Sequence, residues 1–286
     1  MSQLLLATEG GQVVAFDTAT QEHRCVFHSS DDEAMMGIEI VGPHLYVASL
    51  SRLYKLRLDD ASRVAQTRLY DPTPDFHQMS FVDGFLYLTA TKTNEVWLFD
   101  ESLRLSRVHR IDPPDPRRKI EYKKNYNHLN HIVREGDRFY LSLNWFTTTQ
   151  YANSGVLVTD LDLEEIERFE FGWEIHDFQF LDGKRIAICA TSSKGKRVRH
   201  PYRSGLMVEG ELVFEHDAEE AFCKGIAHDE DHIYLCGGRK MERRHRKNSS
   251  SIVYVLRRDN YSLVGTFEST DIKAIKGATR LPDPVR

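Results

Sequence analysis

Three histidines stand just before or at the start of apolar runs that we expect to form β-strands. They are His77 in "FHQMSFV", His128 in "NYNHLNHI" and His176 in "IHDFQFL". Neutral imidazole is the commonest protein ligand for Fe, Mn, Zn, Cu or Ni, and three that converge leave positions open for water and substrate. The pattern therefore predicts a divalent transition-metal site. The alternative is that the three side chains only line a polar channel.

Two more groups with catalytic chemistry lie deeper along the same strands. His131 and Glu39 each come three residues after the aligned position, where Gln179 also falls. We expect His131 and Glu39 to complete the metal site or to act on the substrate.

Two lysines take the histidine position in later strands. Lys224 and Lys276 begin the matching runs "KGIA" and "KGAT". Ammonium groups facing a metal would bind a carboxylate, phosphate or sulfate, so both are candidates for substrate binding and catalysis. The alternative is two lysines whose ammonium groups reach solvent at a rim.

Three basic segments surround these positions in the expected fold, although the whole chain has a net charge of −5. They span residues 112–127, 192–205 and 237–251. Their positive charge favours an anionic small molecule or oligomer, with an acidic protein segment as the alternative partner. The candidate substrate-binding residues on these segments are Arg197, Arg199, Arg239, Arg243 and Tyr126.

The elements that must position these side chains form a repeat. Short runs such as "FLYLTAT" and "HIYLCGG" read as strands, turn residues precede several of them, and no long amphipathic helix is evident. The strand openings align at intervals of about 41 to 52 residues, which is typical of four-stranded propeller blades. The aligned positions are Met36, His77, His128, His176, Lys224 and Lys276.

The two ends of the chain complete the same series. The C-terminal "KGATRL" has no strand after it, while "QLLLATE", "GQVVAFD" and "EHRCVFH" at the N-terminus have no inner strand before them. We therefore predict an all-β, six-bladed β-propeller over residues 1–286, a single domain whose last blade combines three N-terminal strands with one C-terminal strand.

This repeat pattern resembles the six-bladed propeller superfamily that includes NHL-repeat, strictosidine synthase-like and SMP-30-like proteins. The acidic and amide ring that binds calcium in the SMP-30 group is absent from the aligned positions. The ligand type alone resembles propeller lyases and oxygenases that hold a metal by channel histidines.

Composition places the chain among soluble, globular proteins. No apolar run is long enough to span a membrane, and the N-terminal run is too short for a signal peptide. Four separated cysteines without a CxxC pair favour reduced thiols and a cytoplasmic location. The sequence contains no GxGxxG, P-loop, GxSxG or HExxH motif.

These observations predict a metal-dependent enzyme that acts on an anionic substrate, with lyase, hydrolase and oxygenase chemistry left open. Two alternatives remain at this level. A recognition propeller would bind an acidic or phosphorylated partner through its basic face, and a structural module would use its loops for docking. Neither a membrane nor a nucleic acid is an expected partner.

Overall fold

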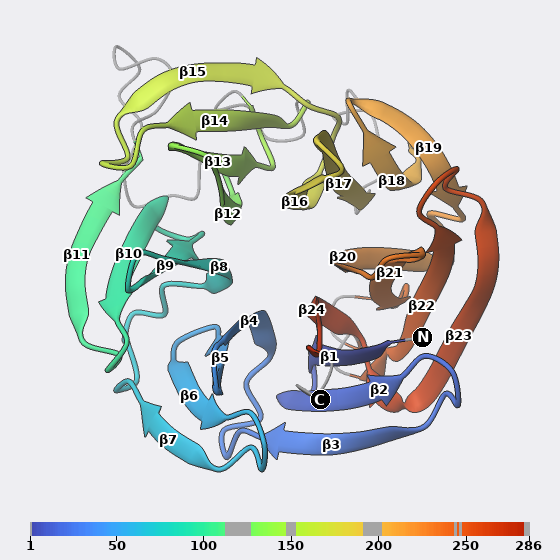
Figure 1. The fold of residues 1–286 in the computed structure, drawn as a ribbon, viewed down its shortest axis with the longest axis horizontal. Coiled ribbons are helices and arrows are strands. Elements are labelled where there is room, and N and C mark those ends of the chain that lie inside the picture. The colour runs from blue at the N-terminus through green and yellow to red at the C-terminus, as the bar shows by residue number, and fades with distance from the viewer. Residues whose placement is uncertain are drawn as a thin grey trace.

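The computed structural model describes residues 2–111, 127–146, 153–190, 202–242, 245 and 248–282. Within that part of the chain, strands β1 to β24 form six antiparallel four-stranded sheets arranged around a central axis (Figure 1). The predicted all-β, six-bladed propeller is therefore confirmed. None of the described residues forms a helix long and apolar enough to cross a membrane.

Five of the blades are built from strands that follow one another in the chain, from the axis outward. The first two contain β4 (Met35–Val41), β5 (His44–Ser49), β6 (Leu53–Arg57) and β7 (Arg63–Gln66), then β8 (Phe76–Val82), β9 (Phe85–Ala90), β10 (Glu95–Asp100) and β11 (Leu105–Arg110). The third contains β12 (Leu129–Glu135), β13 (Arg138–Leu143), β14 (Gly155–Thr159) and β15 (Glu165–Glu170). The fourth and fifth contain β16 (Ile175–Leu181), β17 (Lys184–Ala190), β18 (Ser204–Val208) and β19 (Glu211–His216), then β20 (Ala221–His228), β21 (His232–Arg239), β22 (Ser250–Arg257) and β23 (Leu263–Lys273).

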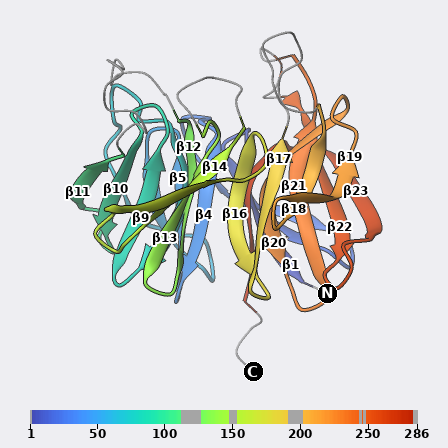
Figure 2. The same ribbon diagram turned by 90° about the horizontal axis from the view of Figure 1, so that it is seen from above.

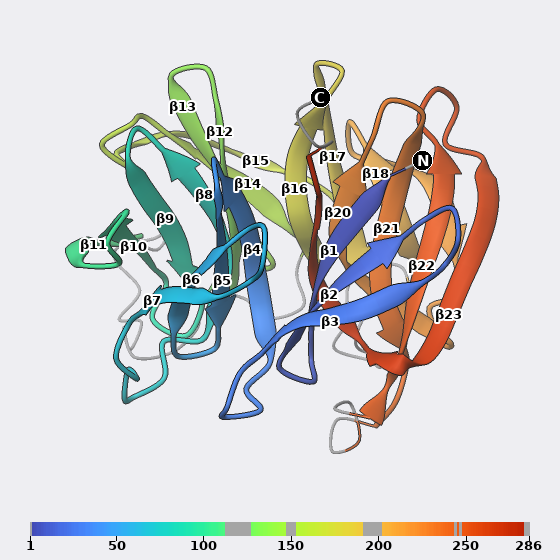
Figure 3. The same cartoon turned by 60° about the horizontal axis from the view of Figure 1, so that its bottom comes forward.

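The last blade closes the ring from both ends of the chain. Its order is β24 (Ile275–Arg280), β1 (Gln3–Thr8), β2 (Gln12–Asp17) and β3 (His23–His28). Leu4 pairs with Arg280 and Leu6 with Ala278, so β24 lies beside β1 as the innermost strand (Figure 3). This pairing confirms the predicted closure by three N-terminal strands and one C-terminal strand, and it covers the inner edge of β1.

The cores of the molecule lie between neighbouring blades. Val96 and Leu98 of β10 pack against Phe139 and Leu141 of β13, for example, in one continuous apolar cluster. Middle strands such as β5 are buried on both faces for this reason, whereas outer strands such as β3 are largely exposed. This stacking fixes the radial position of every innermost strand.

All six innermost strands run in the same direction through the ring. Both termini lie on one face of the disc, where these strands end (Figure 2). Each innermost strand also carries a β-bulge close to its start, shown by a register shift against its neighbour. A bulge inserts an extra residue and changes the direction in which nearby side chains point, and bulges are frequent beside active sites.

Glycines let the innermost strands approach closely at the level of these bulges. A Cβ added to Gly37 would lie 2.4 Å from the backbone oxygen of His77, and one on Gly277 would lie 2.9 Å from the backbone oxygen of Met36. The strands β24, β4 and β8 therefore approach one another closely at this level.

Candidate functional site

The strand registers change one of the predicted equivalences. Phe76, Leu129 and Ile175 occupy the same place in the ladders of their blades, since each forms the first pair of its innermost strand. The residue that corresponds to His77 and His176 is therefore Asn130, not His128.

His128 instead precedes its strand by one residue, at the level of Asp75 and Glu174. All three adopt a positive φ, of 53°, 61° and 42° respectively. The error arose because the alignment matched histidine to histidine, whereas the strand ladders set the equivalent position.

The three predicted histidines nevertheless gather at one mouth of the channel, on the side where the innermost strands begin. We call His77, His128, His176 and Lys224 the histidine mouth. The rings of His77 and His128 lie edge to face with their centroids 5.7 Å apart, and the His128 ring lies 5.3 Å from that of Trp145. His77 and His176 are only 8% and 6% exposed.

Burial is the main influence on the charge of these imidazoles. It lowers the pKa of His77 and of His128 to about 3, and it holds the pKa of His176 well below its ordinary value. The ammonium group of Lys224 lowers the pKa of all three further. The imidazoles are therefore neutral at pH 7, and each offers one N–H donor and one lone pair.

Carboxylates also border the histidine mouth. Asp75 Oδ1 lies 3.7 Å from Nε2 of His77, and the buried Glu174 is 2% exposed. Both carboxylates raise the pKa of His128, although Lys224 and His77 act more strongly in the opposite direction.

The arrangement does not fit the predicted metal site. Among the residues that the structure describes, no group of three or more His, Cys, Asp or Glu side chains is placed to hold a metal ion. A lysine close to all three imidazoles also opposes the binding of a cation. The metal therefore remains a prediction that this geometry does not support.

Lys276 lies at the same level as Lys224 but is occupied by a contact within the protein. Its ammonium group pairs with the carboxylate of Glu9, and it lies 5.6 Å from the centre of the Phe222 ring. Burial lowers the pKa of Lys276 to about 8, while the Glu9 carboxylate favours the charged form. This buried pair fastens β24 to the N-terminal strand.

Most of the predicted basic surface cannot be placed. Tyr126, Arg197, Arg199 and Arg243 lie outside the described residues. Arg239 is described, and its guanidinium forms ion pairs with Glu220 and Glu268. Arg203 and Lys240, which lie on the same two predicted basic segments, bond to Glu215 and to the hydroxyl of Tyr202. These described charges contribute to internal contacts.

Gln78 crosses the channel between the two mouths. Its side-chain amide donates a hydrogen bond to the backbone oxygen of Lys276 at 3.2 Å, which joins β8 to β24 past β4. The Thr89 hydroxyl bonds the backbone oxygens of Gln78 and Asn130, which holds β8 against β12. Gln78 also lines a cavity on the far side of this crossing.

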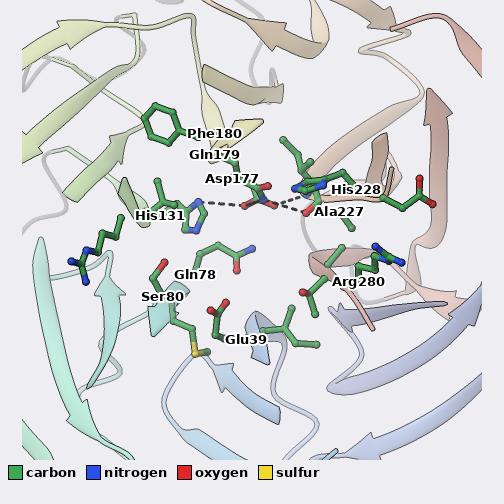
Figure 4. Close-up of a pocket in the computed structure, with 18 of the residues that line it drawn as sticks. Glu39, Gln78, Ser80, His131, Asp177, Gln179, Phe180, Ala227, His228 and Arg280 are labelled. Carbon is green, nitrogen blue, oxygen red and sulfur yellow. Dashed lines mark hydrogen bonds and ion pairs between the residues drawn. The ribbon is translucent and has the colours of Figure 1, made fainter. Parts of the chain in front are cut away.

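That cavity opens at the mouth nearer the chain termini and has a volume of about 550 Å³ (Figure 4). All six innermost strands contribute to its wall at one level, and we call it the acid–base pocket. The residues of that level are Glu39, Ser80, Val133, Gln179, Ala227 and Thr279. His131 and Asp177 line the cavity as well, so two predicted catalytic residues, Glu39 and His131, share this pocket, while Lys224 and Lys276 are absent from its lining.

A buried carboxylate lies beside His131 in this pocket. Asp177 Oδ1 lies 3.3 Å from Nδ1 of His131, and the two side chains face each other in Figure 4. Asp177 also accepts hydrogen bonds from the side chain of Gln179 at 2.9 Å and from the backbone N–H of Ile226. Burial raises the pKa of Asp177 and lowers that of His131, whereas their mutual attraction acts against both changes.

Glu39 supplies a second carboxyl group to the pocket. Burial raises its pKa from 4.5 to about 7; the nearby charge of Asp177 adds to this rise, and a hydrogen bond with the Phe81 backbone opposes it. Near neutral pH this carboxyl exists in both protonation states, as a general acid or base must. Ser80, Gln179 and Thr279 provide uncharged hydrogen-bonding groups around it.

Asp177 and Gln78 were missed as site residues, although the sequence carries a signal for them. Three successive innermost strands contain polar doublets: His77 with Gln78, Asn130 with His131, and His176 with Asp177. In a regular strand only one member of each doublet would face the channel. The bulges bring the second members, Gln78, His131 and Asp177, to the acid–base pocket.

No family model matches the chain, and no curated protein sequence matches it. Similar solved structures include a chain of a nidogen/laminin complex, at 10% identity and a TM-score of 0.66, with 98% of each chain covered. A protein of unknown function from Bacteroides caccae shares 8% identity at a TM-score of 0.68, with 99% of this chain and 100% of that chain covered. The β-propeller domain of Cps50 (Swd1) from Myceliophteria thermophila shares 13% identity at a TM-score of 0.55, with 94% and 84% covered. At these identities the likeness shows the propeller fold alone.

Proposed function

We propose that the protein is an enzyme that transfers protons to and from a small polar molecule bound in the acid–base pocket. The observation that carries this proposal is the presence in one cavity of Glu39, whose pKa is raised to about 7, and of His131, whose Nδ1 lies 3.3 Å from the buried carboxylate of Asp177. Two titratable groups whose surroundings move their pKa values apart commonly serve as the acid and the base of an enzyme.

Each residue has a distinct role in this proposal. His131 is neutral at pH 7 and acts as the base, since the carboxylate of Asp177 orients the ring and stabilises the imidazolium that forms. Glu39, in its protonated form, donates the proton at a second atom of the substrate. Proton removal at one atom and delivery at another is the chemistry of isomerases, lyases and hydrolases.

The chemistry of the wall supports a hydroxylated substrate. The Ser80 hydroxyl and the Gln179 amide donate within the protein and so offer oxygen acceptors, Thr279 adds a hydroxyl, and Val133 and Phe180 offer apolar surface. A volume of about 550 Å³ is that of a typical small-molecule site. A sugar or a small hydroxy acid has hydroxyl groups and C–H faces that match both kinds of surface.

The experiment uses a panel of monosaccharides and 2-hydroxy acids with the purified protein. A shift in melting temperature identifies compounds that bind, and proton NMR in D2O then reports exchange of carbon-bound hydrogen or formation of product. We expect Glu39→Gln and His131→Asn to bind the same compound but to lose exchange or turnover by a factor of about 100 or more. Glu211→Gln, on the exposed part of β19, is the matched control.

A bound compound that exchanges equally in wild type and in both variants would reject the catalytic roles. In the recognition alternative, the basic face would bind an acidic partner. Among the described basic residues, Arg203 and Arg239 already pair with carboxylates of the protein, so they do not favour this alternative. A closer relationship to the NHL-repeat, strictosidine synthase-like and SMP-30-like group is also part of this proposal.

A further inference from the structure

The hydrogen bonds within the wall of the acid–base pocket decide which atoms the wall can offer to a ligand. The Ser80 hydroxyl donates to the backbone oxygen of Ile132 at 2.7 Å, so its oxygen is left as an acceptor. The side-chain nitrogen of Gln179 donates to Asp177 Oδ1 at 2.9 Å and to the backbone oxygen of Ile226 at 3.2 Å. Both of its hydrogen atoms are therefore used, and Gln179 can offer only its oxygen Oε1 to the cavity.

Carboxyl groups outnumber cations in the lining of this cavity. Five carboxyl groups and three guanidinium groups line it, and no lysine does so within the part of the chain that the structure describes. Asp177 is 3% exposed and accepts hydrogen bonds at both of its oxygen atoms, from Gln179 at Oδ1 and from the backbone N–H of Ile226 at Oδ2. N–H partners of this kind stabilise the carboxylate form of Asp177.

The arginines of the lining lie towards the rim of the pocket. Arg134 pairs with Asp83 at 2.8 Å, and Arg258 pairs with Asp182. Arg280 is the last residue of β24. The six-residue level defined above, to which Gln179 belongs, contains no lysine or arginine. A ligand at this level therefore meets oxygen acceptors and negative charge.

We propose that the substrate of the acid–base pocket carries a protonated amino group, which donates to Gln179 Oε1 and is attracted by the carboxylate of Asp177. An ammonium group has N–H donors and no acceptor, so it matches a wall of acceptors beside a negative charge. A carboxylate or phosphate, which the basic segments of the sequence favour, would meet acceptors where it needs donors. This inference rests on the proposed function, because it names the class of molecule on which Glu39 and His131 would act.

The amino group would lie across the cavity from Glu39. Gln179 and Asp177 belong to β16, whereas Glu39 belongs to β4 on the opposite side of the ring (Figure 4). The positive charge is then nearer to Asp177 than to Glu39. Glu39 can therefore keep the proton that it delivers to a second atom of the substrate.

The experiment compares amines with the corresponding alcohols by isothermal titration calorimetry at about pH 6, where both amines are protonated. The pairs are glucosamine with glucose and ethanolamine with ethylene glycol, and glucuronate is the anionic probe. Constant ionic strength removes the general effect of screening. We expect each amine to bind about tenfold more tightly than its alcohol, since one neutral hydrogen bond is replaced by a charge-assisted one.

Gln179→Met should reduce this preference about fivefold, because it removes the acceptor and nearly keeps the volume of the side chain. Gln66→Met, at the exposed end of β7, is the matched control and should bind as wild type does. Equal affinities of each amine and its alcohol would overturn the inference, and so would tighter binding of glucuronate than of glucosamine. No saturable binding of either amine, or an unchanged preference in Gln179→Met, would overturn it as well.

Failure of this inference can be told apart from failure of the proposed function. Hydrogen exchange on glucose or on a hydroxy acid, without a preference for amines, would leave the roles of Glu39 and His131 intact and reject the amine. A preference for amines without exchange in any bound compound would keep the amine site and reject the catalytic roles.

Discussion

Replacing Glu39 by glutamine should change how the stability of the protein depends on pH. The pKa of Glu39 is about 7 in the folded protein and 4.5 in an unfolded chain, because burial penalises the carboxylate. Between these two values the folded protein holds a proton that the unfolded chain has released. The free energy of unfolding of the wild type therefore falls as the pH rises through this window.

The size of the effect follows from the same two values. A rise from 4.5 to about 7 corresponds to about 3 kcal/mol. Glu39 lines an open pocket and is only partly buried, so water in the pocket reduces the penalty, and we expect about 2 kcal/mol. Glutamine keeps an oxygen that can accept the hydrogen bond from the Phe81 backbone but has no charge to bury.

The assay is urea denaturation of wild type, Glu39→Gln and the exposed control Glu211→Gln from about pH 5 to about pH 8. Relative to wild type, Glu39→Gln should gain about 2 kcal/mol across this range, and the control should stay parallel to wild type. A constant difference between wild type and Glu39→Gln would mean that Glu39 titrates normally. That result would refute the raised pKa of Glu39 on which the proposed chemistry depends.

Three further predictions concern the channel. Asp177→Ala should lower the free energy of unfolding by about 2 to 4 kcal/mol in denaturation experiments, because it removes the buried acceptor that joins β16 to β20 and leaves the backbone N–H of Ile226 without it; a loss below about 0.5 kcal/mol would contradict this. Gly37→Ala should cost about 1 to 3 kcal/mol, since its Cβ would lie 2.4 Å from a backbone oxygen of β8, whereas Gly265→Ala has open space and should stay within about 0.5 kcal/mol; equal effects of the two would reject the close approach. Plasma mass spectrometry of untagged wild type and His128→Ala should find less than one equivalent of transition metal in both proteins, and a full equivalent that disappears in the variant would restore the predicted metal site.

The fold could be predicted from the sequence because two independent features agree. The strand openings recur at a blade-like interval, and the incomplete ends of the chain supply the missing parts of one blade. The first and last blades of a propeller bury the apolar faces between them only when the ring closes. The interval between strand openings and the two incomplete ends therefore constrain the number of blades as well as the fold class. The pairing of β24 with β1 follows from that requirement.

The sites could be predicted only in part, because the histidines were aligned by residue type, whereas the strand ladders set the equivalent positions. The alignment placed His128 with His77 and His176, although the ladders align Asn130 with them. Along a strand, three residues cover about 10 Å. Glu39 and His131 were predicted to join the site at the mouth where the strands begin. This distance along the strand instead places them in the pocket at the other end.

The bulges also explain how one repeat can supply two sites. A regular strand alternates its side chains, so one residue of a neighbouring pair would face the channel and the other would enter a core between blades. The extra residue in β8 and β16 lets both neighbours avoid the apolar core. His77 and His176 belong to the histidine mouth, and the residues that follow them, Gln78 and Asp177, line the acid–base pocket. A substitution that removed a bulge would therefore be expected to damage both mouths together, whereas substitutions of the side chains should affect one mouth at a time.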